Sequence, residues 1–328
     1  MISYKEKEKY PNTKQLVSMP YKKNSESTIN HLIATIAKEL FKELEDDTLA
    51  YQYAWWLLEA LTKKRKADLL LNNQIELTHK QKELLEQWVH EIAIDHKPIA
   101  YILGSVPFGP IAITVRPPLL IPRPETEEWA LQIIEQIKHS GAHNLRILDL
   151  CTGSGCIALL FAHMLPDAKV DAIDISDEAI ALATENKQQL NIPNANIMHS
   201  DLFNQLPQQT YDLIISNPPY ITADEYNKLP LSVSKWEDKR ALYAQDEGLS
   251  IIKQIIEKAP LFLNSNKLLQ EKEINQLYIE IGWKQGNIVS TLFEQRGYTN
   301  ITVTQDSAEK DRVISGRIIN VATANIKP

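Results

Sequence analysis

Cysteine, glycine and long apolar runs are all scarce in this chain of 328 residues. The two cysteines, Cys151 and Cys156, lie five positions apart and cannot build the disulfide framework of a small secreted domain. No run of about 18 uncharged apolar residues occurs, so no membrane span is expected. Ten glycines exclude a collagen-like composition. The length favours two domains, or one large α/β domain with an appendage, in a reducing compartment.

An excess of basic residues is also missing. Residues 1–97 hold 15 Lys+Arg and 15 Asp+Glu, whereas residues 98–328 hold 20 and 27, which accounts for the net charge of −7. Proteins that bind nucleic acid through its phosphates usually present a basic face. The acidic larger part of the chain therefore favours a small molecule or another protein as the partner. We expect a monomer with no specific nucleic-acid binding and no membrane association.

Three parts of different character follow one another before the larger part of the chain. Residues 1–28 are polar and Lys-rich and lack the apolar core of a secretory signal, which predicts a flexible tail. Residues 29–97 have apolar positions at helical spacing, with Thr78 as a candidate N-cap, and predict a small helical domain. Residues 98–120 alternate apolar residues with Gly and Pro, the pattern of a β-hairpin linker.

From residue 121 onwards, strand and helix patterns alternate. Strands are predicted at 146–150, 170–175, 196–199, 212–216, 277–281, 301–304 and 312–318. Helical stretches separate the first five strands, which predicts right-handed crossovers and a mostly parallel sheet. The last two strands have only a short connection, so we expect them to form an antiparallel hairpin at one edge.

A loop of small residues follows the first of these strands, in RILDLCTGSGCIALLF (146–161). Gly153 and Gly155 allow the backbone to turn and a ligand to approach the edge where open α/β sheets bind ligands. The dinucleotide fingerprint is incomplete because Ala158 stands at its third glycine. Asp149 at the strand end would repel a pyrophosphate and suits a cationic ligand instead.

Acidic residues also follow the next two strands. Asp174 lies 19 residues after Gly155, where an acid bonds ribose hydroxyls in many nucleoside-binding sheets. Asp201 comes after the third strand and can accept from an adenine amino group. With Asp149, three acids thus end three successive strands at one edge. This combination resembles the S-adenosylmethionine-dependent methyltransferase fold, whose cofactor carries a cationic sulfonium and amine.

The fourth strand, YDLIISNPPYI (211–221), ends in an Asn-Pro-Pro-Tyr sequence across the edge from the glycine loop. Pro218 and Pro219 fix a rigid extended turn, which leaves the Pro218 carbonyl free to accept a hydrogen bond. Asn217 offers a carbonyl acceptor, and Tyr220 offers a flat face. A planar –NH2 group can therefore be held by Asn217 Oδ1 and the Pro218 carbonyl, with its lone pair toward an incoming methyl group.

This tetrad resembles that of enzymes that methylate planar nitrogens. The NPPY strand and segments 98–129, 240–249, 278–298 and 306–317 together resemble the HemK/PrmC family of peptide chain release factor glutamine N(5)-methyltransferases. The resemblance covers about residues 80–328. It implies an α/β fold, that of a Rossmann-like class I S-adenosylmethionine-dependent methyltransferase with a seven-stranded, mostly parallel sheet over 121–328. A helical substrate-recognition domain and the β-hairpin linker would precede it.

The resemblance also implies the residues of the site. S-adenosylmethionine would be bound by Asp149, Cys151, Thr152, Gly153, Ser154, Gly155, Asp174, Asp201, Leu202 and Asn217. The glutamine of a release factor's Gly-Gly-Gln loop would be held by Asn217, Pro218, Pro219 and Tyr220, with Arg123, Glu125 and Thr126 over the active site. Catalysis would rest on Asn217 and Pro218, without a metal.

Two positions depart from the bacterial members of that family. Those members usually carry Gly where Cys151 stands, and often an aromatic residue where Leu202 stands. The second departure leaves two alternatives, a weaker contact with the adenine or a stack on Phe203. The stretch PRPETEEW and the altered loop look closer to fungal mitochondrial members. They predict a mitochondrial matrix location for a eukaryotic protein, and a cytoplasmic one otherwise.

Other functions stay open at this point. An adenine N(6)- or guanine N(2)-methyltransferase acting on nucleic acid would need a positive groove and an added recognition domain. A nucleoside-binding module without catalysis would be favoured by loss of Asn217 or of the small loop, and neither is lost. A dehydrogenase would give Asp149 and the NPPY sequence no role. The charge distribution and the intact motifs favour glutamine methylation.

Overall fold

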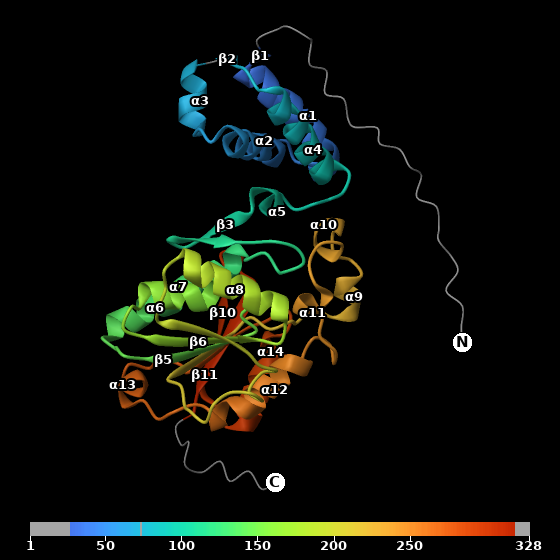
Figure 1. Ribbon diagram of the computed structural model, residues 1–328. Helices are drawn as coiled ribbons and strands as arrows, with labels where there is room; N and C mark the ends of the chain where they lie inside the picture. The colour runs from blue at the N-terminus through green and yellow to red at the C-terminus, as the bar shows by residue number, and fades with distance from the viewer. Residues whose placement is uncertain (1–26, 73, 319–328) are drawn as a thin grey trace, which may run out of the picture. The chain divides into compact units, whose positions relative to one another are not determined.

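The computed structural model describes residues 27–72 and 74–318, drawn in colour in Figure 1. The chain divides into two compact units, and the division falls between Leu103 and Gly104. The predicted tail, residues 1–28, lies outside the described residues except for its last two positions. Among the described residues, no helix is both long enough and apolar enough to cross a membrane.

The first unit is a small helical domain, as predicted. Its elements are β1 (Ser27–Thr28), α1 (Ile29–Leu44), α2 (Asp47–Thr62), α3 (Lys66–Asn72), β2 (Gln74–Ile75), α4 (His79–Ala93) and α5 (Ile99–Leu103). The apolar faces of α1, α2 and α4 form its core, where Leu40, Leu57 and Leu85 are completely buried. Thr78 caps α4 as predicted, because its hydroxyl accepts from the backbone N–H of Gln81 and the Gln81 side chain accepts in return.

The predicted hairpin is shorter than residues 98–120 and is part of the second unit. Its strands are β3 (Ser105–Phe108) and β4 (Ile111–Thr114), while α5 occupies the residues before them. The buried side chain of Asn186 fixes the hairpin. Its Oδ1 accepts from Thr114 N at 2.8 Å, and its Nδ2 donates to Thr114 O at 3.1 Å and to Ser154 O at 2.9 Å. One amide thus joins the hairpin to the glycine loop.

Seven strands among the described residues form the central sheet, in the order β10-β11-β9-β8-β5-β6-β7. They are β5 (Arg146–Leu150), β6 (Lys169–Asp174), β7 (Ala195–His199), β8 (Leu213–Ser216), β9 (Leu277–Glu280), β10 (Thr299–Gln305) and β11 (Asp311–Arg317). The strands from β5 to β9 are parallel, and β11 is antiparallel to both of its neighbours. The predicted sheet and its antiparallel hairpin at one edge are confirmed.

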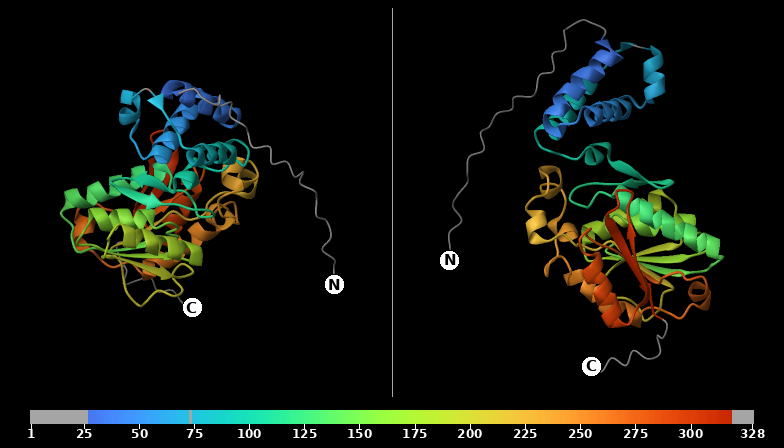
Figure 2. Two further views of the ribbon diagram at one scale, coloured as in Figure 1. Left: turned by 45° about the horizontal axis from the view of Figure 1, so that its top comes forward. Right: turned by 180° about the vertical axis from the view of Figure 1, so that it is seen from behind.

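Helices cover both faces of this sheet (Figures 1 and 2). On one face lie α6 (Pro124–Ser140), α7 (Cys156–Met164) and α8 (Asp177–Gln189), and on the other lie α12 (Ser250–Lys258) and α14 (Gly286–Arg296). On the second face Ile252 and Phe293 pack with Leu148, Ile214 and Ile279 in one core. Shorter elements are α9 (Ala223–Tyr226), α10 (Leu231–Ser234), α11 (Lys239–Leu242), a 3-10 turn η1 (Ala259–Leu261) and α13 (Lys267–Glu271).

The sheet places the sequence motifs at one edge. Because β5, β6, β7 and β8 are parallel, the glycine loop, Asp201 and the NPPY turn follow carboxyl ends of strands, and Asp174 is the last residue of β6 at the same edge. The chain then runs through α9, α10 and α11 at that edge before it enters α12. We call residues 222–242 the post-NPPY segment.

Candidate active site

Two hollows adjoin at the carboxyl edge of the parallel strands. They share Leu120, Asn217 and Ala241 in their walls. Eighteen described residues line one of them, which we call the larger hollow, and ten line the other, which we call the smaller hollow. Asn217 is thus the polar side chain common to both, and it belongs to the NPPY turn that the sequence singled out.

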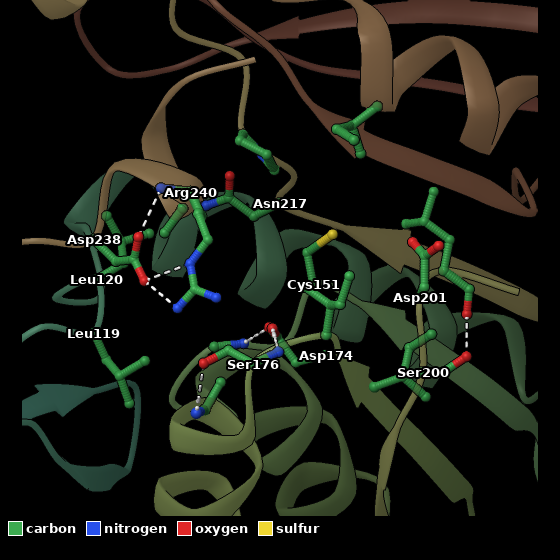
Figure 3. A pocket seen from close by; sticks show the side chains of 18 residues that line it. Leu119, Leu120, Cys151, Asp174, Ser176, Ser200, Asp201, Asn217, Asp238 and Arg240 are labelled. Carbon is green, nitrogen blue, oxygen red and sulfur yellow. Dashed lines mark hydrogen bonds and ion pairs between the residues drawn. The ribbon is translucent and has the colours of Figure 1, made fainter. Parts of the chain in front are cut away.

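Six of the ten residues predicted to bind the cofactor line the larger hollow (Figure 3). They are Cys151, Gly153, Asp174, Asp201, Leu202 and Asn217. Asp174 joins the loop to the end of β6, because its carboxylate accepts from Gly153 N and from Ser176 N, each at 2.9 Å. Burial raises the pKa of Asp174, and the backbone N–H donors act against that rise. The carboxylate therefore stands in the hollow with a fixed orientation.

The other four predicted cofactor residues lie near the end of β5 or within the loop, and they are not among the described residues that line the hollow. They are Asp149, Thr152, Ser154 and Gly155. Asp149 is 1% exposed and accepts from Thr152 Oγ1 at 2.6 Å and Ala158 N at 3.2 Å. Gly155 has φ +83°, and a Cβ there would lie 3.0 Å from Ala183 Cβ. These residues shape the loop, and Asp149 does so without facing the ligand space.

Replacing Asp149 with asparagine is expected to flatten the pH dependence of stability. Burial raises the pKa of Asp149 from 3.8 to about 7, and Oδ1 is buried without a partner. The native state therefore holds this proton better than the unfolded chain, so stability is lost as pH rises toward 7. The melting temperature of Asp149→Asn should fall less than that of the wild type between about pH 5 and pH 8. Parallel curves for the two proteins would contradict the assignment.

Both departures from the family pattern occupy left-handed backbone positions. Cys151 has φ +61° and Leu202 has φ +47°, values that glycine adopts more readily. Both residues still line the larger hollow. Phe203 instead is 4% exposed and stacks on Phe262 with ring centroids 4.7 Å apart. Phe203 is also not among the described residues that line the larger hollow, so the structure gives no support to the alternative of an adenine stack on this ring.

The smaller hollow lies on the other side of Asn217 and receives side chains from several elements. Its walls include Arg123, Tyr220, Leu229, Val233 and Glu280. The Tyr220 hydroxyl donates to Glu280 Oε1 at 3.1 Å, which holds the ring in place. Burial is the main cause that raises the pKa of Tyr220, so the phenol keeps its proton.

The remaining predicted substrate residues have different places. Pro219 lines the larger hollow, and Pro218 is buried in the turn between it and Asn217. Glu125 lies in the first turn of α6 and is not among the described residues that line either hollow. The structure thus brings Asn217, Tyr220 and Arg123 together at the smaller hollow, whereas Pro218, like Glu125, is not among the described residues that line either hollow.

Arg123 has a partner that the sequence did not reveal. Its Nη2 donates to both oxygens of Glu237, at 2.7 Å and 2.6 Å, and Glu237 is 4% exposed. Burial raises the pKa of Glu237, and the neighbouring Arg123 lowers it. This ion pair fastens the post-NPPY segment to the stretch before α6. The backbone N–H of Asp238 adds a second tie by donating to Pro118 O at 2.6 Å.

The post-NPPY segment lines both hollows. Leu229 and Val233 face the smaller hollow, whereas Asp238 and Arg240 line the larger one. Figure 3 shows the Arg240 side chain beside Asp238, where its Nη2 and Nε donate to Asp238 Oδ2 at 2.6 Å and 2.9 Å. The sequence did not indicate that this segment would border both hollows.

The larger hollow fits a nucleoside with a cationic tail. Asp174 and Asp201 supply carboxylates, and Leu119, Ile173 and Ile251 supply apolar surface for a base or a ribose. Gly153 brings backbone, rather than a side chain, to the ligand space. These features suit S-adenosylmethionine, which combines an adenosine with a sulfonium and an amine.

Comparison with known proteins agrees with this geometry. Family models described as PrmC N-terminal domain and Methyltransferase small domain match residues 35–104 and 131–230. A release factor glutamine methyltransferase of Coxiella burnetii is 37% identical over 264 residues, 80% of this chain and 89% of its own length. That of Thermodesulfovibrio yellowstonii is 36% identical over 239 residues, 73% and 82% of the two chains. That of Flavobacterium psychrophilum is 35% identical over 300 residues, 89% and 97%. The present chain belongs to the release factor glutamine methyltransferase family.

Proposed function

We propose that this protein transfers a methyl group from S-adenosylmethionine to the side-chain amide nitrogen of the glutamine in the Gly-Gly-Gln motif of a peptide chain release factor. This reaction supports translation termination. The observation that carries the proposal is the position of Asn217, which stands in the common wall of the larger hollow and the smaller hollow. The chain's membership of the family supports the same substrate.

The larger hollow would hold the cofactor. Asp174 would accept from the ribose hydroxyls, Asp201 with Leu202 would border the adenine, and Gly153 would let the ligand approach the loop. S-adenosylmethionine supplies a methyl group that its sulfonium already activates for transfer. The protein must therefore align the acceptor nitrogen, and it needs no covalent intermediate.

The smaller hollow would hold the glutamine side chain. Asn217 Oδ1 and the Pro218 carbonyl would accept the two amide hydrogens, and Tyr220 would lie against the flat carboxamide. An amide nitrogen is a poor nucleophile because its lone pair is delocalised into the carbonyl. Two hydrogen bonds to its hydrogens localise the lone pair and stabilise the positive charge that develops on nitrogen. Arg123 contributes by holding Glu237 and thus the post-NPPY segment, which borders this hollow.

The decisive experiment uses the full chain with methyl-labelled S-adenosylmethionine and three acceptors. These are an unmodified release factor, the same factor with Ala in place of the motif glutamine, and single-stranded DNA or RNA. Label is expected in the first acceptor alone. Label in the nucleic acid would favour the adenine or guanine methyltransferase alternative. Cofactor binding without any transfer would favour the non-catalytic module.

Location and assembly stay predictions. The mitochondrial address rests on the resemblance of the stretch PRPETEEW and of the altered glycine loop to fungal mitochondrial members. Fusing the chain to a fluorescent protein in a eukaryotic cell tests the address, with retention in the cytosol as the contrary result. Light scattering after gel filtration tests the monomer, and a mass of twice 37.4 kDa would contradict it.

A further inference from the structure

A buried carboxylate, Glu280, lies behind the acceptor side of the site. It ends β9, is 1% exposed and borders the smaller hollow. Oε2 accepts from Thr126 Oγ1 at 2.7 Å and from Trp129 Nε1 at 2.8 Å, and Oε1 accepts from the Tyr220 hydroxyl at 3.1 Å. Burying a carboxylate is costly unless hydrogen bonds compensate for the lost water. Three donors converge here, and two of them come from the first turns of α6.

The direction of these hydrogen bonds determines what Thr126 offers to Asn217. A threonine hydroxyl has one hydrogen, and Thr126 gives it to Glu280. Toward any other neighbour, Thr126 Oγ1 can therefore only accept. Asn217 Nδ2 donates to this oxygen at 3.2 Å. The –NH2 end of the Asn217 amide is thereby directed at Thr126, which leaves Oδ1 as the end that can accept from a substrate.

The opposite orientation of the Asn217 amide would be unproductive. With Oδ1 turned to Thr126, two oxygen lone pairs would face each other, because the Thr126 hydrogen is engaged by Glu280. The substrate would then meet the –NH2 group of Asn217, which donates and cannot accept. A carboxamide substrate offers hydrogens on the nitrogen to be methylated. The two orientations therefore differ in whether the acceptor nitrogen can be held at all.

We propose that Glu280 and Thr126 are positioning residues that fix the orientation of the Asn217 amide, so that Oδ1 always accepts from the substrate carboxamide. This inference rests on the proposed function and deepens it. Glu280 acts through Thr126 and does not itself touch the reacting nitrogen. Glu280 also accepts from the Tyr220 hydroxyl. This hydrogen bond fixes the position of Tyr220, the second side chain of the NPPY turn that faces the smaller hollow.

The proposal is tested with two substitutions at Thr126 and one at Glu280. Thr126→Val keeps the shape and removes the hydroxyl, whereas Thr126→Ser keeps the hydroxyl. Glu280→Gln keeps the shape of the side chain. It replaces one acceptor oxygen with an –NH2 group, which would face the donors from Thr126, Trp129 and Tyr220. Thr126→Val and Glu280→Gln should lower kcat by about 10- to 100-fold, the loss expected for one or two hydrogen bonds. Thr126→Ser should recover most of the wild-type kcat, and all three should bind S-adenosylmethionine like the wild type.

A matched control is Thr291→Val, because Thr291 is exposed on α14 and its hydroxyl donates to Asn287 O of its own helix at 3.1 Å. This variant should methylate like the wild type. A wild-type kcat in Thr126→Val would overturn the proposal. So would a Thr126→Ser variant as slow as Thr126→Val, because the effect would then come from packing rather than from the hydroxyl.

A second readout does not depend on methylation of any protein. The side-chain ¹⁵N–¹H₂ resonances of Asn217, assigned by their loss in Asn217→Ala, report the bond to Thr126. They should shift in Thr126→Val and stay in place in Thr126→Ser. Unchanged resonances in Thr126→Val would refute the amide orientation. If the resonances respond as expected but the wild type labels no release factor, the proposed function fails and the orientation stands.

Discussion

Replacing Asn217 with alanine is expected to abolish methylation of the release factor and to leave S-adenosylmethionine binding nearly intact. The side chain supplies the acceptor that holds the substrate amide, and loss of one preorganised group of this kind lowers turnover by about 10²- to 10³-fold. The ribose and adenine walls, formed around Asp174 and Asp201, are unchanged in this variant. The measurement pairs label transfer under saturating substrates with calorimetric titration of the cofactor.

A matched control for this variant is Asn287→Ala, an exposed asparagine on α14. It should keep both turnover and cofactor affinity. Normal turnover in Asn217→Ala would remove Asn217 from its role as acceptor. Equal losses of turnover and cofactor affinity would instead assign Asn217 to cofactor binding alone.

Replacing Gly248 with alanine should also lower turnover strongly, but through a steric collision rather than through loss of a hydrogen-bond acceptor. Gly248 has φ +80°, and a Cβ at this position would lie 2.0 Å from Tyr220 O and 2.8 Å from Gln285 Nε2. Neither can yield easily, because Gln285 Nε2 itself donates to Tyr220 O at 3.1 Å and Glu247 O at 3.2 Å. We expect the free energy of unfolding to fall by about 3 kcal/mol or more, since overpacking adds to backbone strain. Turnover should fall as the NPPY turn moves.

Gly297→Ala is the control that separates strain from collision. Gly297 has φ +87° at the end of α14, and a Cβ there would meet nothing within 4 Å. It carries the same backbone strain and should cost only about 1–2 kcal/mol, with turnover unchanged. Thermal unfolding and label transfer are measured on both variants. Equal losses of stability and turnover in the two variants would show that the collision with Tyr220 O adds nothing to the backbone strain.

The features predictable from the sequence are those determined by local pattern and by the geometry of parallel strands. Alternation of strands and helices predicts the sheet, and parallel strands bring their carboxyl ends to one edge. Asp174 is the last residue of such a strand, Asp201 and Asn217 follow such ends, and the structure places all three in the walls of one hollow. The residue that breaks this pattern is Asp149, which lies inside β5 and hydrogen-bonds Thr152 and Ala158 beneath the loop.

Hydrogen bonds between distant segments could not be predicted, because they leave no local pattern. Thr126 and Glu280 are 154 positions apart, and Arg123 and Glu237 are 114 apart. In each pair the first residue precedes β5 and the second lies far beyond it in the sequence, so the two residues meet only in the folded chain. One signal was available, since Glu280 is a single acid within the otherwise apolar strand β9. Such an acid is buried only where donors surround it.

The common wall of the two hollows has a consequence for inhibitor chemistry. A compound that joins an adenosine to a primary carboxamide by a short tether passing Asn217 would occupy both hollows at once. Once the adenosine end is bound, the carboxamide end would meet its site at the effective concentration that the tether sets, which is on the order of millimolar for a short flexible linker. Because Leu120 and Ala241 are the other shared wall residues, an apolar tether suits the passage between the two ends.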